Sequence, residues 1–323
     1  MNYRSKNAEL ITKTKNRNRF KENVYGYLFI GPWLICFIVF MAIPFVTSFV
    51  LSFTDYNMLS EPKFIGLNNY IELFTKDKLF WQALSVTFRF VFLSVPLRLL
   101  FALAIALLLN RQSKLVPLYR CVYYLPSILG GSVAVSVMWK YCFSKTGVVN
   151  IFLNSIGIPS DISWISNKDT ALWSIILLFV WQFGSSMLIF LAGLKQIPKN
   201  YYEAATVDGA GVFRQFFNIT LPLLTPIILF NTVMQIIGGF MVFTQAMIIT
   251  DGGPVNKTLV YVLYLYQQSF KYYKMGYGSA MAWVLLLIVG FFTALIFKSS
   301  NTWVFYENES KKPRTKKLKK VVS

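Results

Sequence analysis

One stretch of the chain combines an acidic residue, small residues and a bend in an order that suits contact with another protein. Glu203 precedes two alanines, Ala204 and Ala205. Gly209 follows four residues later, and Gly209 and Gly211 permit a bend. A short helix is expected from about Pro198 through Ala205, because the missing N–H of a proline would be unpaired in a first helical turn anyway. The alanines leave little side chain between this helix and a neighbouring surface. We interpret the stretch as a docking site, with an ordinary solvated loop as the alternative.

The residues after this bend predict a second helix and then a long apolar run. The segment from Val212 to Thr220 is long enough for a short helix, and Pro222 marks the start of the apolar run Leu223–Ile249. We therefore expect a helix–turn–helix that lies outside a bilayer, between two spanning helices.

A cation lies deep in an earlier apolar run, Gln82–Leu109. Arg98 is sixteen residues into this run, which corresponds to about 24 Å at roughly 1.5 Å per residue. A charge at such a depth should face protein or water, and by default it marks a functional position. The alternative is that Arg98 snorkels inward or has a structural partner. Arg89, about seven residues in, is expected to snorkel outward.

The run Leu223–Ile249 carries polar and aromatic residues of the types that bind sugars. Amides pair with hydroxyl groups, and aromatic rings stack on the apolar faces of a pyranose. The candidate residues are Asn231, Gln235, Phe240, Phe243, Thr244 and Gln245. Close packing against another helix is the alternative, because Gln235, Gly238, Gly239 and Val242 share one helical face.

The composition points to a membrane protein without an active site. The chain has 323 residues, of which 55% are hydrophobic and 14% charged, too apolar for a soluble domain of this size. The net charge of +19 would suggest nucleic acid in a soluble protein, but here the basic residues concentrate in the tails and in particular loops. There is no histidine, and the three cysteines have no paired spacing. We expect no metal site, no disulfide framework and no catalytic residue.

Apolar runs long enough to cross a bilayer predict an all-α, polytopic membrane protein with six transmembrane helices. The expected spans are Gly26–Phe53, Gln82–Leu109, Cys121–Phe143, Ala171–Leu194, Leu223–Ile249 and Gly278–Phe297. They divide the chain into a basic tail (1–25), a transmembrane domain (26–298) containing the docking loop (about 195–222), and a second basic tail (299–323). The basic tails place both termini and the docking loop in the cytoplasm, because Lys and Arg favour the inner side; the short loops on the two sides decide less.

The spacing around the docking loop resembles a known signature. Glu203-Ala204-Ala205, Gly209, Ile219 and Leu221-Pro222 resemble the EAA motif in permease subunits of bacterial ATP-binding-cassette (ABC) importers. Within this motif, the residues Asp208-Gly209-Ala210 resemble those of the carbohydrate-uptake group, of the maltose and glycerol-phosphate type. The likeness extends from about Tyr27 to Phe297 and includes Asp251-Gly252-Gly253-Pro254. It implies the core of a type I ABC importer in a bacterial cell membrane.

The resemblance also implies partners and roles. It implies a second homologous permease, two ATPase subunits that bind ATP and Mg²⁺, an extracellular solute-binding protein, and a sugar or oligosaccharide as cargo, with no nucleic acid. Coupling to the ATPase would fall to Glu203, Ala204, Ala205, Asp208, Gly209, Ala210, Leu221 and Pro222. The cargo path would include the polar and aromatic residues of the fifth run, with Arg98 hinting at an acidic sugar. The alternatives are a permease for peptides, amino acids or polyamines, and a membrane scaffold that transports nothing.

Overall fold

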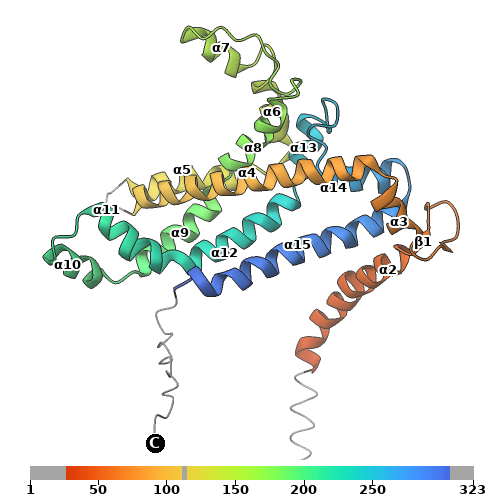
Figure 1. The fold of residues 1–323 in the computed structure, drawn as a ribbon, viewed down its shortest axis with the longest axis horizontal. Helices are drawn as coiled ribbons and strands as arrows, with labels where there is room; N and C mark the ends of the chain where they lie inside the picture. Colours follow the sequence, from red (N-terminus) through yellow and green to blue (C-terminus); the bar gives the residue numbers. More distant parts are fainter. Residues whose placement is uncertain (1–26, 111–114, 306–323) are drawn as a thin grey trace, which may run out of the picture.

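The computed structural model describes residues 27–110 and 115–305, and in this part the chain is mostly helical (Figure 1). It also contains a short antiparallel pair of strands, β1 (Thr54–Asp55) and β2 (Lys63–Phe64), in which Thr54 lies opposite Phe64. The basic tail expected at residues 1–25, and residues 306–323 of the second tail, lie outside the described residues.

The described residues contain four helices that are long and apolar enough to cross a membrane. They are Tyr27–Leu51, α4 (Lys78–Leu109), Val212–Phe240 and α15 (Met275–Trp303). Two bent pairs pass the same test together: α5 (Val116–Leu129) with α6 (Val133–Cys142), and α8 (Ala171–Trp181) with α9 (Gly184–Gln196). The fold is therefore that of a polytopic helical membrane protein with four to six candidate spans.

Shorter elements connect or extend these spans. The helix Tyr27–Leu51 contains the π-turn η1 (Ile38–Ala42) and ends with α2 (Ile43–Leu51). The shorter helices are α3 (Asn68–Thr75), α7 (Val148–Ser155), α10 (Lys199–Val207), α11 (Val212–Gln215), α13 (Thr244–Ile249) and α14 (Tyr261–Tyr266). Two further π-turns are η2 (Phe216–Thr220) and η3 (Gln267–Lys271).

Helix α4 connects the two apolar clusters that hold the bundle together. Its first half contributes Phe80, Phe90 and Val91 to a cluster with α8, α13, α14 and α15. Its second half contributes Ala102 and Ala106 to a cluster with α9 and α12 (Leu221–Phe240). Small residues one turn apart let a neighbouring helix approach closely. Figure 1 shows α4, α12 and α15 side by side, with α10 and α11 at one end of the bundle and α3 and β1 at the other.

The fifth predicted span and the helix before it differ from expectation. The sequence predicted a short helix over Val212–Thr220 and a separate span after Pro222. The structure instead has one continuous helix over residues 212–240. Within it, η2 lets Leu221 donate its N–H to the carbonyl of Phe216, so the hydrogen-bond ladder shifts register just before the proline. The expected span Leu223–Ile249 ends early, at Phe240, and α13 begins separately at Thr244.

The third predicted span, Cys121–Phe143, is not straight. Helices α5 and α6 meet at 98°. Gly130 and Gly131 lie at the break, and Ser132 caps α6 by accepting the N–H of Val135. A Cβ on Gly130 would overlap the side chain of Gln182, which lies at the 41° break between α8 and α9. The two breaks are therefore packed against each other.

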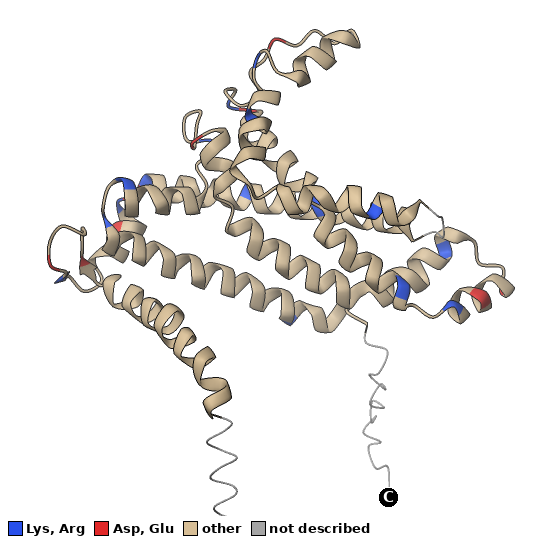
Figure 2. Cartoon of the chain, turned by 180° about the vertical axis from the view of Figure 1, so that it is seen from behind, with Lys and Arg blue, Asp and Glu red and all other residues tan. Residues whose placement is uncertain are grey.

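The first helix lies apart from the bundle. No part of the apolar stretch within Tyr27–Leu51 is buried against the rest of the chain, and Figure 1 shows α2 diverging from α15. The end of this helix makes ring contacts, with Phe45 and Phe49 each 4.7 Å from Trp283. Figure 2 shows that the charged residues gather mainly in loops and at helix ends, which leaves long apolar surfaces. Lipid or another protein must cover these surfaces.

Candidate functional site

The docking loop contains a compact helix that ends in a glycine turn. Helix α10 begins at Lys199, with Pro198 as its N-cap rather than its first residue. Gly209 has φ +75°, and its N–H bonds to the carbonyl of Thr206 at 3.0 Å. The N–H of Ala210 bonds to the carbonyl of Ala205 at 2.8 Å. This pair of bonds is a Schellman motif, in which glycine supplies the left-handed residue. The bend therefore lies at Gly209, while Gly211 is the extended N-cap of α11.

Side-chain hydrogen bonds hold α10 against the start of the following helix. Gln215 donates to Thr206 Oγ1 at 3.1 Å and to the carbonyl of Ala210 at 3.0 Å. The hydroxyl groups of Tyr202 and Thr220 are 2.9 Å apart. These bonds connect α10 to the helix Val212–Phe240, which includes α12.

The outer surface of α10 is exposed and includes small side chains. Glu203, Ala204 and Asp208 are exposed, and Ala205 and Ala210 are half-buried. Glu203 has no ion-pair partner within residues 27–110 and 115–305. A charge without a partner, beside alanines on a helix held by its neighbours, suits a complementary surface on another protein.

Three apolar residues that the sequence analysis did not single out extend this surface. Val207, Val212 and Phe213 are 88%, 81% and 83% exposed. Large apolar side chains at such exposure are typical of interaction surfaces when they are contiguous. The sequence contained one signal for them, because they are apolar residues in a loop that is expected to lie outside the bilayer.

Leu221 and Pro222 lie at the base of the loop and are half-buried. Pro222 lines a cavity of about 250 Å³ with Tyr201, Ile219 and Phe305 among the other lining residues. The N–H of Phe305 donates to Thr225 Oγ1 at 2.8 Å, so the segment after α15 is attached beside the base of the docking loop. Thr225 Oγ1 also donates to the carbonyl of Pro222 at 2.6 Å, which has no N–H partner one turn later because residue 226 is proline.

The six sugar-binding candidates of the fifth run lie on two sides of a helix break. Asn231 is fully buried, and neither atom of its amide has a hydrogen-bond partner in the described chain. Gln235 donates to Ser186 Oγ on α9 at 2.9 Å. Phe240, at the end of α12, is 5.4 Å from Phe88 between ring centres. The other three candidates belong to the start of α13.

Beyond the break, the remaining candidates are half-buried. The ring of Phe243 is 5.0 Å from that of Tyr266, and Thr244 and Gln245 open α13. The close packing expected for this region holds for Gly239, where an added Cβ would be 3.1 Å from Val91 on α4. Gly238 has open space instead.

Arg98 is 7% exposed and lies against the break between α8 and α9. Its guanidinium donates to the carbonyl of Gln182 and is 4.5 Å from the centre of the Phe179 ring. Ser127 Oγ donates to the same carbonyl at 2.9 Å, and the Gln182 amide donates to the carbonyl of Gly130 at 2.7 Å. Arg98 therefore belongs to a polar junction, the Gln182 junction, that supplies partners to backbone groups at both helix breaks.

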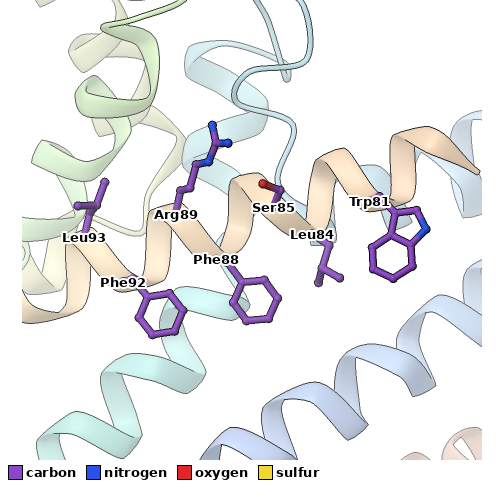
Figure 3. Close-up of a pocket in the computed structure, with 7 residues that line it drawn as sticks. All are labelled: Trp81, Leu84, Ser85, Phe88, Arg89, Phe92 and Leu93. Atoms are coloured by element: carbon purple, nitrogen blue, oxygen red, sulfur yellow. The ribbon is translucent and has the colours of Figure 1, made fainter. Parts of the chain in front are cut away.

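Arg89 lies in a different environment from Arg98. It is exposed, on a groove of about 590 Å³ along α4. Figure 3 shows the side chains of this groove, with Arg89 and Ser85 on one edge and Trp81, Phe88 and Phe92 on the other. Arg89 has no hydrogen bond, ion pair or ring contact with any described residue.

At the other end of the bundle, Asp77 connects three helices. One carboxylate oxygen accepts the N–H of Phe80 at 3.0 Å and caps α4. The other accepts the hydroxyl of Tyr264 at 2.6 Å and that of Tyr277. Burial and the hydrogen bond to Asp77 raise the pKa of Tyr264 above its ordinary value.

The turn Asp251-Gly252-Gly253-Pro254 lies close to the start of α4. The amide of Gln82 donates to the carbonyls of Val255 and Asn256, both at 3.2 Å. Thr258, fully buried, donates to the carbonyl of Gly253 at 2.6 Å. Val255, at the tip, is 79% exposed. The described residues contain no group of three or more His, Cys, Asp or Glu side chains that could hold a metal ion.

Comparisons with known proteins agree with this arrangement. Residues 28–302 match the family model "Binding-protein-dependent transport system inner membrane component". The chain is 55% identical to the probable ABC transporter permease protein YesP of Bacillus subtilis, over 91% of this chain and 96% of that protein. It is 35% identical to the lactose transport system permease protein LacF of Rhizobium radiobacter, over 88% and 97%.

A solved structure shares the fold. It is a chain of the bacterial alginate ABC transporter in complex with a periplasmic protein bound to alginate pentasaccharide, with a TM-score of 0.76 at 21% identity, covering 88% of this chain and 96% of that chain. Because the family model matches most of the chain, the protein belongs to the inner membrane components of binding-protein-dependent transport systems: it is a multi-pass permease subunit of an ABC transporter, binds no cofactor itself and relies on a separate ATPase.

Proposed function

We propose that this permease imports saccharides. The observation that carries the proposal is the similarity to named sugar permeases: the relative LacF is a lactose transport permease, and the alginate transporter, which shares the fold, imports a polysaccharide. The alternatives are another solute, such as a peptide, amino acid or polyamine, and a scaffold that transports nothing.

The docking loop is proposed to couple ATP hydrolysis to transport. Glu203 would pair with a basic group on the ATPase, and Ala204 and Ala205 would allow close contact. Asp208, Gly209 and Ala210 would fix the bend, and Leu221 and Pro222 would join it to the membrane helix. The exposure of Glu203, which has no ion-pair partner in the described part of the chain, and the attachment of α10 to the helix Val212–Phe240 support this role.

The proposed assembly contains this chain, a second homologous permease, two ATPase subunits and an extracellular solute-binding protein. ATP binding would close the ATPase pair and move each docking helix, so that the cavity changes from inward-facing to outward-facing; hydrolysis would reset it. In this arrangement both termini and the docking loop (about 195–222) lie in the cytoplasm. The tails 1–25 and 299–323 flank the transmembrane domain 26–298.

The cargo path is proposed to include the residues around the break after α12. Phe240, Phe243, Thr244 and Gln245 surround that break, with Asn231 and Gln235 deeper in the bundle. For Arg98, whose role was left open between cargo and structure, we propose the structural role, because its guanidinium donates to a backbone carbonyl and lies against an aromatic ring.

The first test replaces two residues of the docking loop in the assembled complex. Glu203→Lys reverses the charge, and Gly209→Pro removes both the left-handed residue and the N–H that bonds to Thr206. Both should reduce saccharide uptake by proteoliposomes at least tenfold and abolish cargo-stimulated ATP hydrolysis, with unchanged membrane insertion.

Glu61→Lys provides the matched control, because it makes the same charge change in the exposed loop between β1 and β2, at the other end of the bundle. Unchanged uptake in either docking-loop variant would remove the coupling role. Absence of cargo-stimulated ATP hydrolysis in the wild-type complex, for saccharides and other solutes alike, would favour the scaffold.

A further inference from the structure

Helix α4 carries two arginines within its membrane-spanning length, and only one of them has polar or ring partners among the described residues. Arg98 is committed to the Gln182 junction. Arg89, nine residues earlier, is exposed and has no interaction with any residue in the described ranges.

The depth of Arg89 makes its exposure significant. The 32 residues of α4 span about 48 Å at ~1.5 Å per residue, compared with a hydrocarbon thickness of about 30 Å. With the helix centred in the bilayer, Arg89 lies within the hydrocarbon depth. A charged side chain there is expected to face protein, water or a polar ligand rather than lipid tails.

The residues around Arg89 form an elongated surface with mixed chemistry. The groove is lined by three aromatic rings, those of Trp81, Phe88 and Phe92, together with Ser85 and two leucines. In Figure 3 the rings lie along one edge of α4, while Ser85 and Arg89 project from the other. All the lining residues belong to α4, so a ligand would lie along the helix.

These groups suit a saccharide that carries a carboxylate. A guanidinium presents N–H donors in a planar fork that matches both oxygens of a carboxylate. The Ser85 hydroxyl can donate to or accept from a sugar hydroxyl, and aromatic rings can cover the apolar face of a pyranose. A neutral sugar would leave the charge of Arg89 unpaired.

The groove adjoins the proposed cargo path. Phe88 lines the groove, and its ring is 5.4 Å from that of Phe240 at the break after α12. The same two rings contact Phe292 on α15, at 5.4 and 5.8 Å. A ligand that contacts Phe88 in the groove would therefore be separated from Phe240, a residue assigned to the cargo path, by one aromatic ring.

We propose that the groove along α4, with Arg89 on one edge and the aromatic rings on the other, is a subsite that binds the carboxylate of an acidic saccharide during import. This inference rests on the proposed function of saccharide import and names the cargo class as uronate-containing oligosaccharides.

The test measures uptake by proteoliposomes that contain the complete transporter with its binding protein. The cargoes are a uronate oligosaccharide and the neutral oligosaccharide obtained by reducing its carboxyl groups. The variants are Arg89→Gln, Arg89→Lys and, as a control for loss of an exposed positive charge outside the groove, Lys140→Gln at the end of α6.

Arg89→Gln should raise the KM for the acidic cargo at least tenfold and change uptake of the neutral cargo less than twofold. Arg89→Lys, which keeps the charge without the planar fork, should give an intermediate KM. Lys140→Gln should leave both cargoes unaffected.

Three results would overturn the subsite. The first is an unchanged KM for the acidic cargo in Arg89→Gln. The second is an equal loss of uptake of the acidic and neutral cargoes in that variant. The third is a wild-type transporter that imports only the neutral cargo. A loss that occurs only in vesicles containing phosphatidylglycerol, and equally for both cargoes, would assign Arg89 to an anionic lipid headgroup instead. Failure of the wild type to import any saccharide would reject the proposed function as well, and so differs from the first three results.

Discussion

A single side chain, Arg98, donates a hydrogen bond where two broken helices meet. A helix break leaves carbonyl groups without their usual partners, and in a membrane water does not replace them. The carbonyl of Gln182 receives both Arg98 and Ser127, and the Gln182 side chain reaches the carbonyl of Gly130. The Arg98 guanidinium therefore supplies a hydrogen-bond donor to a backbone carbonyl at the break. A neutral side chain of similar length would supply fewer N–H donors.

Replacement of Arg98 tests this role. Arg98→Gln should lower the stability of the purified complex by about 1.5–3 kcal/mol, the contribution of a charge-assisted hydrogen bond. It should also reduce uptake of neutral and acidic oligosaccharides by the same factor. Arg98→Lys should recover part of both. Thermal unfolding and parallel uptake assays measure these effects; a loss restricted to acidic cargo would place Arg98 in the cargo path.

Among the elements, the bent pair α5–α6 is held in position by close packing at one glycine. A Cβ at residue 130 would overlap Gln182 and approach the carbonyl of Pro126 to 2.6 Å. The next residue, Gly131, has no heavy atom within 4 Å of such a Cβ. Two adjacent glycines at one bend therefore have different requirements.

This difference gives a matched pair of variants. Gly130→Ala should destabilise the complex by about 1–3 kcal/mol, the usual cost of overpacking, and lower its unfolding temperature. Gly131→Ala should change stability by less than about 0.5 kcal/mol. Thermal unfolding of the two variants beside wild type measures the difference. Equal behaviour would show that the 98° bend does not depend on contact with Gln182.

Considered as a whole molecule, the chain has large apolar surfaces that it does not cover itself. The first helix buries none of its apolar stretch against the rest of the chain, and α10 and α11 present Val207, Val212 and Phe213 to the exterior. The membrane covers the first kind of surface and, in the proposed assembly, an ATPase covers the second.

The orientation of the whole chain can be measured with single cysteines. In a background that lacks the three native cysteines, a cysteine at Ser5 or Ser323 should react with a membrane-impermeant maleimide only after the membrane is opened. A cysteine at Ser60, in the loop between β1 and β2, should react in intact cells. The physical basis is the excess of Lys and Arg in the two tails. Labelling of the tails in intact cells would reverse the proposed topology.

The sequence by itself determined the class of the protein. Long apolar runs and scarce charge require a membrane fold, since no soluble core could bury them, and the spacing from Glu203 to Pro222 resembled a permease signature that the family match confirms. It also indicated a bend at Gly209 and Gly211, because glycine adopts positive φ readily; the structure shows that Gly209 is the residue with positive φ.

Only the tertiary structure decided how the spans bend and which charges are free. The sequence predicted one span over Leu223–Ile249, yet α12 ends at Phe240. The apolar run continues through the break, so hydrophobicity did not reveal it. Likewise, depth along α4 drew attention to Arg98 and treated Arg89 as peripheral. Partners for a buried charge come from residues distant in sequence, and the structure supplies them to Arg98 while leaving Arg89 without any in the described chain.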